Sequence, residues 1–264
     1  MRVIVLSLLF LFSVPLQALE CPRIISQSPY ITHTLIWLGL EECIVGVSRY
    51  DMLDLPRTGG ILDPDKDALD SLMADIILTA NWISEADMQK LTPEGIRFYR
   101  LNGFDSMDQI IENMNLILKL TGQQASTDKI SLFQKNLNRQ IQEIHANNQK
   151  ALLISSCSGS PYSFGKRTWL YDLFTRIGFN MVETHTKIRH IKPGYEIDEL
   201  TSLINTFKPH IVFILERKLN SKCNLILPKL PVKIITMDGR NFLHPAPVLL
   251  TGLNELNAKQ WQWH

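Results

Sequence analysis

The stretch STDKISLFQKNLNRQIQEIHAN, residues 126–147, decides the predicted architecture. Its apolar side chains recur at steps of three and four residues, with Gln, Asn and Lys between them: Ile130, Phe133, Leu137, Ile141 and Ile144. This is the period of an amphipathic helix. Gly and Pro are absent from 125–149, so the helix should be stiff, and at 1.5 Å per residue its roughly 20 residues would reach about 30 Å. Residues 125–148 are therefore predicted to form one rigid backbone helix.

Short β-branched runs alternate with helical segments on both sides of this helix, which is typical of parallel sheets covered by helices. The predicted strands are 23–26, 44–48, 76–80 and 96–100 before the helix, and 151–155, 179–183, 211–215 and 232–236 after it. The sequence thus predicts an α/β fold with two lobes, 19–124 and 149–264, each with a central, mostly parallel sheet flanked by helices. The backbone helix joins them.

The first 18 residues resemble a secretory signal peptide. Arg2 precedes an unbroken apolar run, and a small-residue cleavage pattern ends at Ala18. The run is too short to span a bilayer, and no later segment offers roughly 20 uncharged residues. We therefore expect residues 1–18 to be removed and the mature chain to be soluble and periplasmic. A lipid anchor on Cys21 is disfavoured, because Glu20 stands where acylation needs a small residue.

Composition excludes two broad classes. A hydrophobic content of 45% is ample for real cores and excludes general disorder. The formal net charge is +1 and falls to zero once Arg2 is removed. Nucleic acid is therefore not expected as a partner, because neutralising phosphates needs a surplus of Lys and Arg.

Four cysteines enter an oxidising compartment, where disulfides are the default expectation and three full pairings are open. Cys21 and Cys43 precede the first two predicted strands, which neighbour each other about 4.8 Å apart in a sheet of this kind, so a disulfide there is geometrically natural. Cys157 and Cys223 follow strands of the second lobe. They are expected to form a second bridge, with soft thiolate ligands for a metal as the alternative.

Several motifs, in order along nearly the whole mature chain, resemble one family. They are the SP-x-x-T turn from Ser28, the LGL-x-x-x-(I/V)VGVS run, the GG-x-L-x-P-x-x-x-A-L stretch, SPYSFGKRTWLYDLFTRIGFN, KPHIVFI and the terminal D-x-x-x-F-x-x-P-x-P from Asp238. The chain resembles the helical-backbone metal-receptor family of periplasmic solute-binding proteins. Two departures concern the ligand: His33 replaces the usual Glu after the Thr of the first turn, and Ala246-Pro247-Val248 replaces Gly-Pro-Arg.

The resemblance implies the periplasmic substrate-binding subunit of an ABC importer. Its ligand would be a metal chelate, cobalamin or a ferric siderophore, captured between the lobes and delivered to a permease with its ATPase at the inner membrane. The expected protein is a monomer that needs no cofactor and performs no catalysis. In the resemblance each lobe also presents an acidic residue for permease docking; motif position gives Asp67 in the first lobe and Asp198 or Glu199 in the second. Helix N-terminal carboxylates that are stabilised by the helix dipole are the alternative.

Loops that leave the carboxyl ends of parallel strands converge on one edge of a sheet, so two facing lobes should form a cleft from such loops. This rule selects Tyr30, Arg49, Tyr50, Asn81, Trp82 and Phe104 in the first lobe, and Ser158, Tyr162, Phe164, Lys166, Glu216, Asp238 and Arg240 in the second. Aromatic rings would cover a macrocycle or aryl chelator, and Arg and Lys would suit an anionic chelate. Tyr50 and Trp82 are the favoured stacking residues; the alternative for Trp82 is packing inside the lobe.

Other ligands and activities fit less well. Haem-binding members of the family that this chain resembles supply a ligating Tyr in the loop that here reads LPRTGGILDPD, so the resemblance disfavours haem. A bare Zn or Mn ion would need several His and carboxylate ligands. No His pair has helix-face spacing, and His185 and His190 are expected to be solvated. A direct metal-ion or haem receptor is the alternative, and a secreted enzyme is a weaker one. The segment GSPYSFGKRT departs from a phosphate loop, and there is no G-x-S-x-G or H-E-x-x-H.

Overall fold

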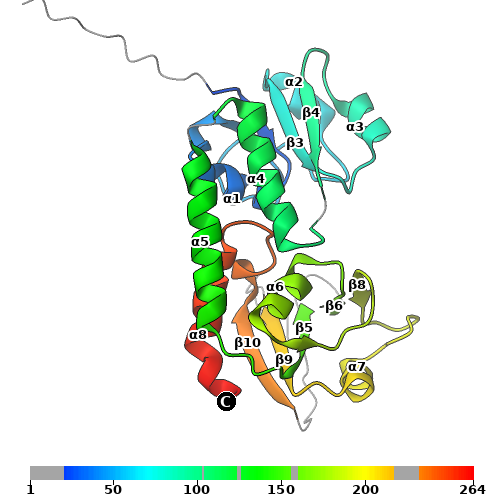
Figure 1. The fold of residues 1–264 in the computed structure, drawn as a ribbon. Coiled ribbons are helices and arrows are strands. Elements are labelled where there is room, and N and C mark those ends of the chain that lie inside the picture. Colours follow the sequence, from blue (N-terminus) through cyan, green and yellow to red (C-terminus); the bar gives the residue numbers. More distant parts are fainter. Residues whose placement is uncertain (1–20, 103, 124–125, 156–159, 217–231) are drawn as a thin grey trace, which may run out of the picture.

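A computed structural model describes residues 21–102, 104–123, 126–155, 160–216 and 232–264. Two α/β lobes lie one beyond the other along a pair of long helices (Figure 1). The elements of the first lobe are β1 (Ile24–Ser26), α1 (Pro29–Leu38), β2 (Ile44–Val47), α2 (Lys66–Ser71), β3 (Ile76–Ala80), α3 (Glu85–Leu91) and β4 (Arg97–Leu101). The long helices α4 (Met107–Thr121) and α5 (Thr127–Glu143) follow them.

The second lobe contains β5 (Lys150–Ser155), β6 (Tyr162–Phe164), α6 (Trp169–Ile177), β7 (Asn180–Met181), β8 (Ile188–His190), α7 (Leu200–Phe207), β9 (Ile211–Glu216), β10 (Lys233–Asp238) and α8 (Leu249–Lys259). Its sheet has the strand order β10-β9-β5-β6-β8, with β7 paired to β5. Strands β10, β9, β5 and β7 run parallel, whereas β6 and β8 form an antiparallel edge. The predicted fold class is confirmed.

The sheet of the first lobe is entirely parallel, with the order β2-β1-β3-β4. Its central strands β1 and β3 are buried along their whole length, which explains their continuous apolar sequences. A disulfide joins Cys21 to Cys43, whose Cα atoms are 5.7 Å apart, just before the paired strands β1 and β2. The predicted pairing of these two cysteines is confirmed.

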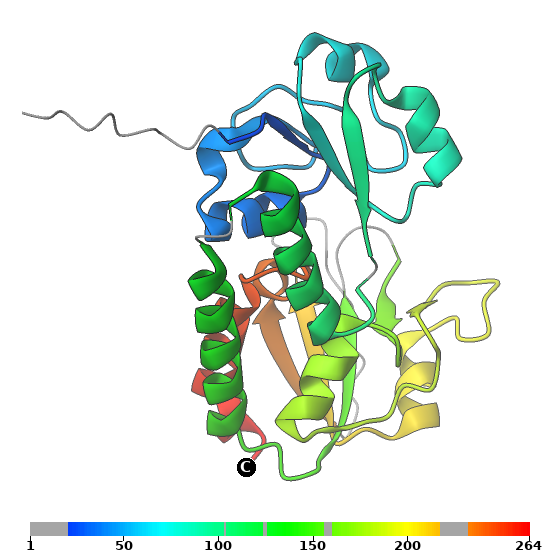
Figure 2. The same cartoon turned by 45° about the horizontal axis from the view of Figure 1, so that its top comes forward.

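Helix α5 connects the lobes as the sequence predicts. It packs against α1 and α4 of the first lobe and against α6 and α8 of the second, and both views show it running alongside both lobes (Figure 1, Figure 2). Its buried face includes Ile130, Phe133 and Leu137. Among the described residues, no helix is both long and apolar enough to cross a membrane.

A second connection ties the segment before α4 to the start of α6. The backbone N–H of Trp169 donates to the carbonyl of Phe104 at 2.7 Å, and the N–H of Met107 donates to Asp172 Oδ2 at 2.8 Å. Two ion pairs flank these hydrogen bonds, Arg167 with Asp105 at 2.5 Å and Arg176 with Asp108 at 2.9 Å. The lobes are therefore fixed to each other at α5 and at α6.

The antiparallel edge of the second sheet is the main feature that the sequence patterns do not predict. Strands β6 and β8 are only three residues long, and a buried ion pair supports them. The Arg189 guanidinium of β8 donates to the fully buried carboxylate of Glu183, and the Ser163 hydroxyl of β6 donates to the same carboxylate. Burial opposes ionisation of Glu183, but the hydrogen bonds from Arg189 and Ser163 outweigh it, so its pKa is lowered.

Candidate functional site: a cavity between the lobes

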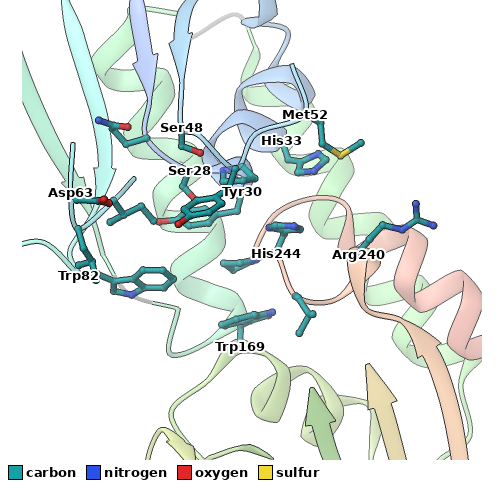
Figure 3. Close-up of a pocket in the computed structure, with 17 residues that line it drawn as sticks. Ser28, Tyr30, His33, Ser48, Met52, Asp63, Trp82, Trp169, Arg240 and His244 are labelled. Atoms are coloured by element: carbon teal, nitrogen blue, oxygen red, sulfur yellow. The ribbon is translucent and has the colours of Figure 1, made fainter. Parts of the chain in front are cut away.

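A cavity of about 430 Å³ lies where the two lobes face each other (Figure 3). Its first-lobe lining is Gln27, Ser28, Pro29, Tyr30, His33, Ser48, Tyr50, Met52, Ile61, Leu62, Asp63 and Trp82, and its second-lobe lining is Trp169, Arg240, Leu243, His244 and Pro245. Seven of the twelve first-lobe residues lie within four residues after β1, β2 or β3, and four of the five second-lobe residues follow β10. The cavity thus lies at the carboxyl ends of the parallel strands, as expected for α/β sheets.

Tyr30 lies in the first turn of α1, where Pro29 occupies a first-turn position that needs no N–H donor. Its side chain is 5% exposed, and its hydroxyl makes no hydrogen bond with the described residues that meets ordinary distance and angle limits. Burial raises the pKa of Tyr30 well above its usual range, and the nearby Ser28 hydroxyl lowers that pKa only slightly. Tyr30 therefore keeps an unionised hydroxyl that is buried beneath the cavity lining and has no ordinary hydrogen-bond partner among the described residues.

Ser48 provides a second hydroxyl of the same kind. It directly follows β2, is fully buried, and its Oγ has no hydrogen-bond partner among the described residues. Both polar atoms of the neighbouring Gln27 side chain, by contrast, have a partner: Nε2 donates to the Thr58 carbonyl at 3.1 Å, and Oε1 accepts from the Thr58 hydroxyl at 3.0 Å. Buried polar groups without partners are rare and costly, so two of them at one cavity indicate a polar ligand group there.

The cavity rim is strongly apolar. Tyr50, Met52, Leu62 and Trp82 are 71%, 84%, 70% and 56% exposed, and they make up half of the large hydrophobic side chains that the described part of the chain exposes. The ring of Trp82 contacts the rings of Tyr30 and Phe104, with centroids 6.3 and 6.0 Å apart. A cluster of exposed apolar side chains around a cavity is typical of a binding surface.

The loop between β2 and α2 supplies Ile61, Leu62 and Asp63 to the cavity. Its tight path requires Gly59, which has φ of +83° and where a Cβ would lie 2.6 Å from the carbonyl oxygen of Asp63. Arg49, at the start of this loop, forms an ion pair with Asp63 at 2.7 Å. Arg49 itself does not line the cavity.

The second lobe contributes both aromatic and charged side chains to the cavity lining. The indole N–H of Trp169 donates to the Phe242 carbonyl at 3.0 Å, which fixes that ring at the lobe interface. Arg240 pairs with Asp238 at 2.5 Å. Gly239 precedes it, and a Cβ there would lie 2.9 Å from the Glu216 backbone, so the chain passes close to the end of β9 at this point.

One histidine from each lobe reaches the cavity. His33 of α1 and His244, which follows β10, have ring centroids 5.6 Å apart at an interplanar angle of 47°. Both are visible between the lobes in Figure 3. Burial lowers the pKa of His33, and the Asp51 carboxylate partly offsets this. His33 is thus neutral near pH 7 and keeps a nitrogen lone pair.

The structure divides the binding residues expected from the sequence into two groups. Four line the cavity: Tyr30, Tyr50, Trp82 and Arg240. Five lie outside its lining: Arg49, Tyr162, Phe164, Lys166 and Glu216. Phe164 is buried in the core and Tyr162 packs against that core, because both belong to β6 and not to a loop. Lys166 is exposed.

The remaining expectations for the cleft and the metal ligands have mixed outcomes. Asn81, Phe104 and Asp238 do not line the cavity; Phe104 packs beneath Tyr30. Ser158, Cys157 and Cys223 lie outside the described residues. Asp67, Asp198 and Glu199 are exposed at or beside the N-termini of α2 and α7. Within the described ranges, no group of three or more His, Cys, Asp or Glu side chains is arranged to hold a metal ion.

Sequence reasoning missed His33, Trp169 and His244 as cavity residues. His33 stands at a position where this chain departs from the motifs of the family it resembles, and His244 lies two residues before the other departure, at Ala246. These departures are the signal that could have found them. Trp169 lies inside a matching motif at the start of a helix, so nothing in its local sequence indicates the interface.

Comparison with known proteins identifies the fold. Neither a scan against protein-family models nor a search of curated proteins gave a match. Among solved structures, the periplasmic haem-binding protein HutB of Vibrio cholerae matches over 90% of this chain and 98% of its own, at 17% identity and a TM-score of 0.74. The vitamin B12-binding protein BtuF of the same organism matches over 92% and 98%, at 17% identity and a TM-score of 0.70.

A third structure, the siderophore-binding protein BauB bound to two acinetobactin molecules and ferric iron, matches over 92% of this chain and 94% of its own. The identity is 15% and the TM-score is 0.68. All three matches span both lobes and the connecting helix. The chain therefore has the two-lobed fold of periplasmic binding proteins of the cobalamin, haem and siderophore class.

Proposed function

We propose that this chain is the substrate-binding subunit of an ABC importer and captures a metal chelate, cobalamin or a ferric siderophore, in the cavity between its lobes. The observation that carries the proposal is the cavity itself, which both lobes line at the carboxyl ends of their strands. The solved proteins that share the fold bind vitamin B12, haem or a ferric siderophore. In this proposal the protein binds and releases its ligand without chemical change, so it is not an enzyme.

The lining matches the chemistry of a chelate. Tyr50 and Trp82 offer flat apolar faces at the rim, which suit a macrocycle or an aryl chelator. The hydroxyls of Tyr30 and Ser48 are buried beneath this lining and lack hydrogen-bond partners within the described chain. In this proposal, polar groups of the bound ligand reach them and supply those partners. Pockets of about 300 to 1,000 Å³ are typical for small-molecule ligands, and this open cavity of about 430 Å³ lies within that range.

The rest of the importer proposal concerns the outer surface and the chain ends. Asp67 lies on the exposed side of the first lobe, and Asp198 and Glu199 lie on that of the second, where they would pair with basic residues of a permease that carries its ATPase. Exposed ion pairs are individually weak, so these would serve orientation more than affinity. We also propose that residues 1–18 are a cleaved signal peptide and that the mature protein is a periplasmic monomer. Its lobes would comprise residues 19–124 and 149–264, joined by the helix at 125–148.

Intrinsic fluorescence tests the binding claim. Two of the five Trp residues, Trp82 and Trp169, line the cavity. We expect cyanocobalamin, haemin or a ferric catecholate siderophore to quench the emission of the purified mature chain at micromolar concentration. Trp82→Phe should remove part of the quenching, whereas Trp261→Phe should leave the ligand concentration at half-quenching unchanged and should not reduce the fractional quenching, because Trp261 is 72% exposed outside the cavity lining. If none of these chelates quenches, the chelate proposal is wrong.

A further inference from the structure

Asp51 connects two segments that line the cavity. It lies in the loop after β2, between Tyr50 and Met52, which both belong to the lining drawn in Figure 3. Its Oδ2 accepts a hydrogen bond from the Thr32 hydroxyl of α1 at 2.6 Å. Because a carboxylate only accepts hydrogen bonds, the single proton of the Thr32 hydroxyl lies on this contact. Asp51 thus joins the loop after β2 to the helix that carries Tyr30.

The other carboxylate oxygen fixes the path of the loop itself. Asp51 Oδ1 accepts from the backbone N–H groups of Met52 at 2.8 Å and of Leu53 at 3.2 Å, the pattern by which an Asp side chain stabilises a turn. The backbone N–H of Asp51 donates to the Ser48 carbonyl at 3.1 Å. Arg57 Nη1 donates to the carbonyls of Ser48 and Asp51 at 3.2 and 3.1 Å. Hydrogen bonds that centre on Asp51 therefore order this loop.

The two rim side chains need this support because they have little packing of their own. Tyr50 is 71% exposed and Met52 is 84% exposed. A side chain that is mobile before binding loses conformational freedom when it contacts a ligand, and each such side chain lowers the affinity by about twofold to tenfold. A backbone that is already fixed before binding removes part of this loss.

We propose that Asp51 is a positioning residue of the binding site and holds Tyr50 and Met52 where they contact the bound ligand. This inference rests on the proposed function. Asp51 itself does not belong to the cavity lining, so it acts through the two rim side chains and not through contact with the ligand. The effect of its removal on binding should therefore disappear when those two side chains are absent.

A double-mutant cycle separates positioning from a general loss of structure. The probe is the one of cyanocobalamin, haemin and a ferric catecholate siderophore that quenches the wild-type chain, and its affinity is measured by calorimetric titration. We expect Asp51→Ala to weaken binding by about fivefold or more. In the background Tyr50→Ala/Met52→Ala, the further loss from Asp51→Ala should be less than about twofold. The matched control is Asp54→Ala, an exposed carboxylate of the same loop outside the cavity lining, which should bind as wild type does.

Asp51→Asn tests whether the hydrogen bonds are the cause. Its amide oxygen can accept from the loop N–H groups, and its N–H can donate to the Thr32 oxygen, so the link to α1 is kept without the charge. We expect Asp51→Asn to bind within about twofold of wild type. Thermal unfolding followed by circular dichroism shows whether Asp51→Ala folds. If it does not, Thr32→Val, which breaks the same link from α1, replaces it in the cycle.

Hydrogen exchange followed by mass spectrometry adds a measurement that needs no ligand. In Asp51→Ala, the amides of residues 49–57 should exchange faster than in wild type, while those of β1 and β3 exchange at the wild-type rate. Unchanged exchange in 49–57 would overturn the positioning role.

The binding results separate this role from the proposed function. Wild-type affinity in Asp51→Ala, an equal loss in both backgrounds, or a loss in Asp51→Asn as large as in Asp51→Ala would overturn the positioning role and leave the chelate cavity intact. If none of the three chelates binds the wild-type chain, the proposed function is wrong and the role of Asp51 falls with it.

Discussion

At the scale of single residues, variants that remove the two unpartnered hydroxyls near the cavity test whether these groups serve ligand binding or folding stability. Tyr30→Phe and Ser48→Ala remove hydroxyls that have no hydrogen bond within the described chain, so each variant should keep or slightly gain stability. Each should weaken binding of the chelate that quenches wild-type fluorescence by about threefold to tenfold, the worth of one hydrogen bond. Urea unfolding and fluorescence titration measure the two effects.

Thr58→Val is the matched control for these variants. The Thr58 hydroxyl lies 3.0 Å from both Gln27 Oε1 and the Val47 carbonyl, and the residue is fully buried. Its removal leaves the Gln27 oxygen without that donor and should cost about 1 to 3 kcal/mol of unfolding free energy. If Tyr30→Phe destabilised the ligand-free protein as much as Thr58→Val, the Tyr30 hydroxyl would be structural and its assignment to the ligand would be wrong.

The raised pKa of Tyr30 also gives a pH dependence with a definite sign. The unfolded chain releases this proton near pH 10, whereas burial keeps Tyr30 protonated in the folded protein to higher pH. Stability from this group is therefore complete below about pH 10 and declines above it, by up to about 1.4 kcal/mol per pH unit. Unfolding in urea between pH 9 and 11 should show a shallower decline for Tyr30→Phe than for wild type. Parallel curves would contradict the burial of this hydroxyl.

At the scale of elements, the ion pair of Glu183 and Arg189 supports the β6–β8 edge. Glu183→Gln leaves the buried guanidinium of Arg189 without the negative charge of its main partner and should cost about 3 to 5 kcal/mol in urea unfolding. Glu196→Gln removes the other partner of Arg189, but the Glu196 side chain is 80% exposed, so we expect a loss below about 1 kcal/mol. Equal losses in the two variants would show that the buried pair does not support this edge.

The β6–β8 edge is also the part of the fold that the sequence patterns did not predict. Long periodic or continuous apolar segments predicted α5, β3, β5 and β9 well, because burial of a whole face leaves a clear pattern. Strands β6 and β8 are three residues long and depend on a charged pair. One partner, Glu183, ends the predicted strand 179–183, and the other, Arg189, lies in a segment that the local pattern treats as polar loop. Tyr162 and Phe164 were therefore expected in the cleft, whereas the hydrogen bonds of β6 turn the first against the core and bury the second within it.

At the scale of the whole molecule, four cavity residues were predicted because loops after parallel strands meet at one edge of a sheet, and applying this rule needs only the order of strands. They are Tyr30, Tyr50, Trp82 and Arg240. The meeting of His33 with His244 depends on how the lobes are set against each other. That arrangement comes from α5 and from contacts such as Arg176 with Asp108, between residues far apart in the sequence. No local pattern contains this information.

The same contacts predict a nearly rigid molecule. Lobes joined by α5 and by the hydrogen bonds of Trp169 and Met107 should change their relative position little on binding. We expect small-angle X-ray scattering profiles with and without the saturating chelate to superpose. A clear contraction would indicate hinge closure and would contradict the role given to α5.

The central claim is that one ligand contacts both lobes, and calorimetric titration of one variant from each lobe tests it most directly. Trp82→Ala in the first lobe and Leu243→Ala in the second each truncate a cavity side chain, and Trp261→Ala is the exposed control. We predict that both cavity variants weaken the same chelate by at least about fivefold, at unchanged stoichiometry, while the control binds as wild type does. Wild-type affinity in either cavity variant would contradict a binding site shared by the two lobes.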